Sequence, residues 1–190
     1  VDGVQQQWTV GRRQQLNMAR ALAPGPELVV SDEPVSELEV SLQKQIVELL
    51  QRLQVQGGVS MLFISHDQSV VERIAARNAV MYAGHIVEIL PKNDMWRDAA
   101  HPYTRLLLST LPGASPDQRR LSHAPVEEES EVNPYALTKG CRFQHRCPNV
   151  QDHCRVQAPV LTSHGIAQQV ACHYPHAPVD KALIIRRAVS

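Results

Sequence analysis

The chain has 190 residues and no net charge at pH 7, with 19 lysines and arginines against 19 aspartates and glutamates. A balanced charge argues against nucleic-acid binding, which usually needs a basic surface, and no apolar run approaches the roughly 20 residues that cross a bilayer as a helix. Hydrophobic residues make up 43% of the chain, enough for the core of one domain and a small appendage.

The N-terminal part of the chain predicts two helices and two strands in alternation. Residues 12–22 predict a helix, which the run Ala23–Pro26 ends. Residues 27–31 predict a short buried strand because apolar side chains dominate them. Apolar residues then recur at helical spacing over residues 41–54, and residues 59–64 return to a strand pattern. A strand, a helix and a strand with short joins predict a parallel crossover unit.

The following segment predicts a helix, a hairpin and a last helix. Asp67 is placed to cap a helix that runs through Ala75. Residues 79–82 and 85–89 predict the two strands of a hairpin, because Ala-Gly stands between them. Residues 99–110 predict the last helix of this layer.

Two of the predicted strands end in polar side chains. Asp32 and Glu33 follow the first strand directly, and His66 follows the second. Carboxylates at the carboxyl end of a buried strand are how P-loop ATPases hold magnesium and a catalytic base beside a triphosphate. We therefore expect Asp32 to bind Mg²⁺, Glu33 to act as general base, and His66 to contact the γ-phosphate.

Several segments, in the same order along the chain, carry a family resemblance. They resemble the ATP-binding subunits of ABC transporters, and the later ones resemble the C-terminal extension of oligopeptide and dipeptide importers. The segments are Gly11–Leu22, Glu27–Pro34, Val35–Val40, Leu62–Asp67, His101–Leu107, Gly140–Pro148 and Ala171–His173. The resemblance runs from about Gln7 to about Tyr174.

The resemblance implies an α/β fold, the C-terminal part of a P-loop ATPase domain with parallel strands, followed by a small loop-rich cysteine module. It also implies that further residues bind ATP, either in the signature loop or in the D-loop. These are Thr9, Val10, Gly11, Arg12, Ser36 and Glu39. Val10 stands where the family has a glycine, so the composite ATP site that this loop closes is expected to be weakened.

No Gly-x-x-x-x-Gly-Lys-Ser/Thr sequence occurs in the 190 residues. We therefore expect a truncated or decayed chain, inactive alone, that corresponds to the C-terminal part of a longer subunit. The expected divisions are the ATPase part at 1–111, a linker or extended arm at 112–139, the cysteine module at 140–176 and a tail at 177–190.

All four cysteines lie in the expected module, at Cys141, Cys147, Cys154 and Cys172. No Cys-x-x-Cys pair occurs, so the usual spacing of a structural zinc site is absent. Four thiolates in a small loop-rich module can hold a [4Fe–4S] cluster, and the resemblance implies the same cofactor. Zinc, helped by His145, His153 or His173, is the alternative, followed by two disulfides or free thiols.

The expected function is ATP hydrolysis that drives peptide import. The implied partners are a second ATPase subunit in a head-to-tail dimer, two membrane permeases and, through them, an extracytoplasmic peptide-binding protein, with no nucleic acid. The implied location is the cytoplasmic face of the inner membrane, as a peripheral protein. One rival is a non-catalytic interaction or metal-binding remnant that binds no ATP alone. A soluble ABC ATPase of repair or translation type is the other.

Overall fold

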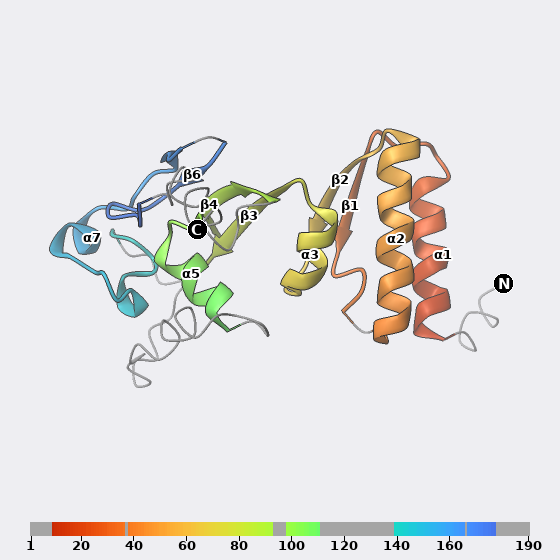
Figure 1. Ribbon diagram of the computed structural model, residues 1–190, viewed down its shortest axis with the longest axis horizontal. Coiled ribbons are helices and arrows are strands. Elements are labelled where there is room, and N and C mark those ends of the chain that lie inside the picture. Colours follow the sequence, from red (N-terminus) through yellow and green to blue (C-terminus); the bar gives the residue numbers. More distant parts are fainter. Residues whose placement is uncertain (1–8, 37, 93–97, 111–138, 166, 178–190) are drawn as a thin grey trace, which may run out of the picture. The chain divides into compact units, whose positions relative to one another are not determined.

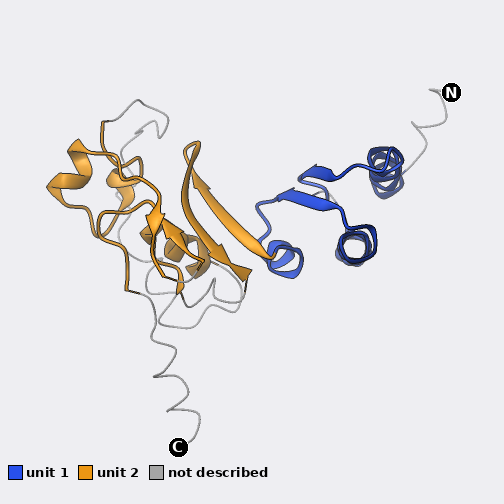
Figure 2. Cartoon of the chain, turned by 90° about the horizontal axis from the view of Figure 1, so that it is seen from above, with its two compact units in different colours: residues 1–75 blue, residues 76–190 orange. Residues whose placement is uncertain are grey.

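A computed structural model describes residues 9–36, 38–92, 98–110, 139–165 and 167–177 (Figure 1). The chain divides into two compact units, Val1–Ala75 and Ala76–Ser190 (Figure 2). The linker expected at 112–139 lies almost wholly outside the described residues, as does the tail beyond residue 177.

The N-terminal unit alternates helices and strands, as the sequence predicts. Its elements are α1 (Val10–Leu22), β1 (Leu28–Asp32), α2 (Val40–Gly57), β2 (Ser60–Ile64) and α3 (Gln68–Ile74). Strands β1 and β2 pair in parallel, in a register that sets Leu28 beside Ser60 and Asp32 beside Ile64. The predicted parallel crossover is therefore confirmed, and so is the cap on α3, because the Asp67 side chain accepts from the N–H groups of Ser69 and Val70.

Helix α2 carries the core of this unit. Its side chains Ile46, Val47 and Leu50 are buried at helical spacing and cluster with Val35, Val70 and Ile74. Gly58 caps the end of the helix, and its φ of 61° is the left-handed conformation that a residue without Cβ adopts at little cost.

The strands of the N-terminal unit are less covered than the sequence predicts. Neither β1 nor β2 has a fully buried residue, and their side chains alternate between half-buried and exposed. Leu28, Val30, Leu62 and Ile64 are all exposed on them. The prediction of a buried strand over 27–31 is wrong for this chain, because an apolar run indicates a buried strand only where other elements cover both faces of the sheet.

The C-terminal unit is built around an antiparallel sheet in the order β3-β4-β6-β5. Its strands are β3 (Arg77–Tyr82), β4 (His85–Pro91), β5 (Thr162–Ser163) and β6 (Gln169–Val170), and its helices are α5 (Pro102–Ser109), η4 (Gln144–Arg146) and α7 (Asp152–Val156). The predicted hairpin turns at Ala83 and Gly84, which both have positive φ. The mixture of parallel and antiparallel sheets with helices confirms the α/β class.

Aromatic rings join the hairpin and α5 to the segment that carries the cysteines. Phe143, which is 1% exposed, lies 5.2 Å from Tyr82 and 5.5 Å from Tyr103 between ring centroids. Tyr82 and Tyr103 pack in turn beside the core cluster of Val80, Val87, Leu90, Ala99 and Leu108. Burial of these large rings is a main favourable contribution to the stability of the unit.

A charged side chain, Glu88 of β4, is completely buried in the same unit. One of its carboxylate oxygens accepts from Ala100 N at 2.7 Å and from Gln168 Nε2 at 2.8 Å. The other accepts from His101 N at 3.1 Å. Three N–H donors thus compensate the cost of burying the carboxylate, and they tie the start of α5 and the start of β6 to β4.

Within the described part of the chain, none of the helices has the length and apolar character needed to cross a membrane.

Replacing Glu88 by Gln should destabilise the C-terminal unit by about 2 kcal/mol, because the new amide turns a donor toward groups that are themselves donors. Urea denaturation followed by circular dichroism measures this change. Glu48→Gln is the control, since the side chain of Glu48 pairs with Lys44 at the exposed surface at 4.0 Å, and should cost less than about 0.5 kcal/mol. Equal stabilities for the two variants would contradict the role given to Glu88.

Candidate functional site

The carboxyl ends of β1 and β2 bring together three of the residues singled out from the sequence. Asp32 is the last residue of β1, Glu33 follows it, and His66 stands two residues after β2. Because the strands are parallel and in register, both polar ends lie at one edge of the sheet. The backbone N–H of Glu33 also donates to the Ile64 carbonyl at 3.0 Å, which continues the pairing past the last residue of β1.

Glu33 and His66 form a close polar pair. The ring Nδ1 of His66 lies 2.8 Å from Glu33 Oε1, and the backbone N–H of His66 donates to the same oxygen at 3.0 Å. The hydrogen bond to Glu33, together with the negative charge of Glu33, raises the pKa of His66. The arrangement therefore favours a positively charged imidazole against a carboxylate.

The backbone of Glu33 has an unusual positive φ, which sets the direction of its side chain. Its φ of 44° lies in the left-handed region, which a residue with a Cβ adopts at some cost. The Ser36 hydroxyl donates to the Glu33 carbonyl at 3.2 Å and so holds this turn. Glu33 Oε2 is buried and has no hydrogen-bond partner among the described residues. One carboxylate oxygen of Glu33 is thus paired with His66, and the other is not.

The remaining predicted ATP residues fall into two groups. Asp32, Ser36 and Glu39 are exposed, and Glu39 is the N-cap residue of α2 without a side-chain capping bond. The second group, Thr9 to Arg12, lies at the start of α1. This helix begins on the same side of the unit as the ends of β1 and β2 (Figure 1). Because its hydroxyl holds the turn at Glu33, Ser36 has a structural role in addition to the ATP-binding role that the resemblance implies.

At the start of α1, Thr9 is the N-cap, and its hydroxyl accepts from Arg12 N at 3.4 Å. Val10 is 41% exposed. Gly11 is buried, and a Cβ at this position would collide with the Leu42 side chain of α2. The sequence predicts Gly11 as a permissive position near phosphate; the structure adds that Gly11 packs against the Leu42 side chain of α2, which a Cβ at this position would displace.

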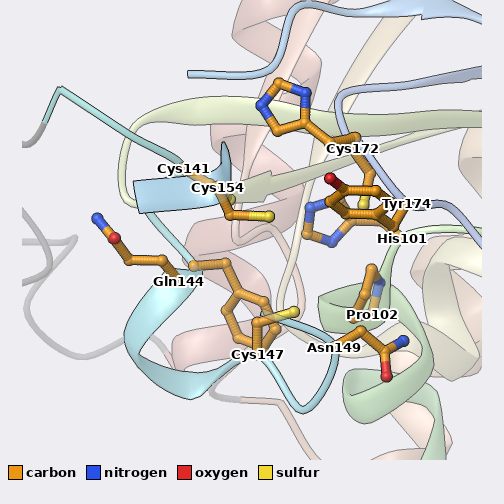
Figure 3. Close-up of a pocket in the computed structure, with 11 residues that line it drawn as sticks. His101, Pro102, Cys141, Gln144, Cys147, Asn149, Cys154, Cys172 and Tyr174 are labelled. Atoms are coloured by element: carbon orange, nitrogen blue, oxygen red, sulfur yellow. The ribbon is translucent and has the colours of Figure 1, made fainter. Parts of the chain in front are cut away.

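The four cysteines, which are spread over more than thirty positions, line one pocket in the C-terminal unit. Cys141 precedes η4, Cys147 follows it, Cys154 lies in α7 and Cys172 follows β6. Figure 3 shows these side chains around the pocket with His101, Pro102 and Tyr174 among them. A backbone hydrogen bond from Cys141 N to the Cys154 carbonyl at 2.7 Å fastens two of the cysteine segments together.

Burial raises the pKa of the Cys141 and Cys147 thiols, and it raises that of Cys172 to about 11. The neighbouring cysteines act in the same direction, since each disfavours a second negative charge. Backbone hydrogen bonds oppose this rise. They come from the residue two positions along the chain in each case, namely Phe143, Asn149 and Tyr174. N–H groups directed at sulfur are the local support that a thiolate needs.

No three or more His, Cys, Asp or Glu side chains are arranged to hold a metal ion among the residues that the structure describes. The metal expected from the sequence therefore stays a prediction. The residues nevertheless fit a thiolate-bound group in their donor chemistry, because four sulfurs line one pocket and three of them have backbone donors.

Sequence reasoning missed three residues of this region, namely Glu88, Gln168 and His101. A glutamate inside a strand pattern and a histidine before Pro102 were the available signals, but neither shows what the side chain contacts. His101 lines the cysteine pocket and is 1% exposed, and burial lowers its pKa to about 4.

Residues 87–154 match the family described as the oligopeptide/dipeptide transporter C-terminal region. The chain is also similar to longer proteins. It is 44% identical over 182 residues to the probable peptide ABC transporter ATP-binding protein y4tS of Sinorhizobium fredii, covering 95% of this chain and 50% of that protein. It is 43% identical over 166 residues to the putative oligopeptide transport ATP-binding protein YkfD of Bacillus subtilis, covering 86% of this chain and 50% of that protein.

A putative peptide import ATP-binding protein of Brucella abortus is 47% identical over 163 residues, which are 86% of this chain and 47% of that protein. The chain thus spans about half the length of the curated relatives it matches. The resemblance that the sequence motifs carry is confirmed.

Replacing Glu33 by Gln should lower the pKa of His66, because the variant removes the negative charge that favours the protonated ring. Proton NMR titration of the histidine ring resonances measures this change. Glu48→Gln in α2 is the control, and it should leave the His66 titration unchanged. The pairing would be refuted by a His66 titration that the substitution leaves unchanged.

Proposed function

We propose that this chain, which is similar to the C-terminal half of peptide ABC transporter ATP-binding proteins, forms the part of such a subunit that supplies the hydrolytic residues. The similarity over 95% of the chain supports the class of protein. The observation that carries the mechanism is the Glu33–His66 pair at 2.8 Å, beside Asp32 at one sheet edge.

The roles of the three residues follow from their chemistry. Asp32 holds Mg²⁺, which needs few protein carboxylates when phosphates and water complete its ligands. Glu33 acts as the general base that takes the proton from the attacking water. His66 holds Glu33 in place and, when protonated, offers positive charge to the γ-phosphate. Little more is required, because phosphoryl transfer depends mainly on positioning and charge neutralisation.

The exposed residues act between subunits. The N-cap Thr9 and the first turn of α1 as far as Arg12 close over ATP held by the other ATPase subunit of a head-to-tail dimer, and the N-terminus of the helix favours a phosphate there. Val10 weakens this contact by adding a branched side chain where backbone approaches the nucleotide. Ser36 and Glu39 communicate between the two ATPase subunits.

The whole assembly imports peptides. Two membrane permeases bind the ATPase pair at the cytoplasmic face of the inner membrane, and an extracytoplasmic binding protein delivers the peptide. Residues 140–176 form a module in which Cys141, Cys147, Cys154 and Cys172 hold a [4Fe–4S] cluster, with Zn²⁺ as the alternative. The cluster would supply a structural crosslink between segments that are distant in the chain.

A second candidate is a non-catalytic metal-binding or interaction protein. The specific observation in its favour is that the 190 residues contain no Gly-x-x-x-x-Gly-Lys-Ser/Thr sequence to cradle the phosphates.

A chimera tests the first proposal against the second. Its N-terminal half comes from the Sinorhizobium fredii relative and its C-terminal half is this chain. It should hydrolyse ATP, and Glu33→Gln should reduce the rate by about 100-fold or more without preventing ATP binding, because the general base is lost. Phosphate release measures hydrolysis, and a fluorescent ATP analogue measures binding.

Glu48→Gln serves as the control, since Glu48 lies in α2 outside the proposed site, and should leave the rate unchanged. If the chimera with the Glu33→Gln substitution binds ATP and hydrolyses it at the unsubstituted rate, the role of Glu33 is contradicted. A folded chimera without ATP binding would favour the non-catalytic candidate.

A further inference from the structure

The C-terminal unit contains a second cavity, of about 260 Å³, which adjoins the pocket of the four cysteines. Three segments that are distant in the chain supply most of its lining. They are residues 85–87 of β4, residues 140–143 before η4 and the segment that leads into β5. The residues proposed to bind or hydrolyse ATP all belong to the other unit, so none of them lines this cavity.

The wall of this cavity is mostly apolar. Phe143 is 1% exposed, whereas Ile86 and Leu161 keep 37% and 36% of their surface in contact with solvent. The cavity therefore runs from the interior to the surface of the unit. A concave apolar wall with few polar groups is typical of small-molecule sites, and a volume just below their usual range of roughly 300–1,000 Å³ indicates a small ligand.

Arg142 gives the cavity its charge. Of the residues that line it, Arg142 is the one with a permanently charged side chain, and no aspartate or glutamate is among them. His101 also lines the cavity but adds no charge near neutral pH, because burial lowers its pKa to about 4. Arg142 is half-buried, and in the described part of the chain no carboxylate pairs with it. A cation without a counter-charge favours a ligand that carries a negative charge.

The charge and the wall together define a class of ligand. A guanidinium presents N–H groups in a planar fork, which matches the two oxygens of a carboxylate. An apolar tail on the same molecule would be removed from water against Phe143 and Leu161, which favours binding in proportion to the apolar area buried. An amine would meet Arg142 as a like charge and is therefore disfavoured.

We propose that this cavity is a binding site for small carboxylates with a short apolar tail. The carboxylate pairs with Arg142, and the tail packs against Ile86, Phe143 and Leu161. Two kinds of molecule share this chemistry, namely the C-terminal residue of a peptide and a short-chain fatty acid. The inference goes beyond the proposed function, because it requires neither ATP hydrolysis nor a metal at the cysteines.

The first part of the experiment varies the ligand. The isotope-labelled full chain is titrated with N-acetyl-leucine, which mimics a peptide C-terminus, with octanoate, and with the uncharged amide of N-acetyl-leucine, and NMR chemical shifts are followed. The better of the two carboxylates should saturate with a dissociation constant of about 1 mM, as expected for a ligand of this size, and it identifies the source. The amide should bind about 10-fold more weakly than the acid, because it cannot form the charged pair.

The second part varies the charge of the cavity. Arg142→Gln should weaken binding of the better carboxylate about 10-fold, because hydrogen bonds between two charged groups are lost. Arg155→Gln is the matched control, since Arg155 is exposed in α7 and does not line the cavity, and it should leave the affinity unchanged.

The third part varies the wall at two adjacent positions. Leu161→Glu places a negative charge in the cavity and should abolish saturable binding. Val160→Glu introduces the same charge at a residue that is 72% exposed and does not line the cavity, so this variant should bind like the unsubstituted chain. The NMR spectrum of each variant shows at the same time whether it is folded.

Absence of saturable binding for both carboxylates would overturn the inference and leave the proposed ATPase function, which the chimera tests, untouched. Equal affinities for N-acetyl-leucine and its amide, or equal losses in Arg142→Gln and Arg155→Gln, would show that Arg142 pairs with no carboxylate and would overturn it as well. Equal losses in Leu161→Glu and Val160→Glu would place the binding outside the cavity, with the same consequence.

Discussion

The C-terminal unit depends on the buried carboxylate of Glu88. An unpaired charge at this depth would cost several kcal/mol, and three N–H donors from two distant segments offset that cost. Because the donors must stay in place, the start of α5 and the residue before β6 are fixed against β4. The same bonds set the ring of His101 beside the cysteines. A charge buried in a strand thus fixes the backbone of His101 at the start of α5, next to the thiol pocket.

The N-terminal unit uses a carboxylate in the opposite way. Glu33 stands in a strained backbone conformation at a strand end, half-buried, with one oxygen bound to His66 and the other without a partner among the described residues. An incompletely paired carboxylate is expensive in a core, and strained or unpaired groups cluster at functional sites. The general-base role proposed for Glu33 is consistent with its incomplete pairing, whereas the complete pairing of Glu88 gives rigidity.

The sequence predicted what depends on local pattern. Helical spacing over 41–54 and the apolar strands on either side identified the parallel crossover, and the polar strand ends identified Asp32, Glu33 and His66. Contacts between distant segments were not predictable, because no local pattern records them. The pairing of Glu88 with Gln168 joins residues eighty positions apart, and Gly11 packs against the Leu42 side chain of another helix. The exposure of β1 also differed from the prediction, because the burial of a strand depends on which other elements cover the faces of its sheet.

The metal content of the chain, purified without oxygen, tests the account most directly. If the proposed cluster is present, the four cysteines of one pocket predict about four irons with a matching amount of sulfide per chain. Elemental analysis with a sulfide assay measures both, and Cys147→Ser should lower them together. Zinc in place of iron, or four free thiols without metal after anaerobic purification, would contradict the account.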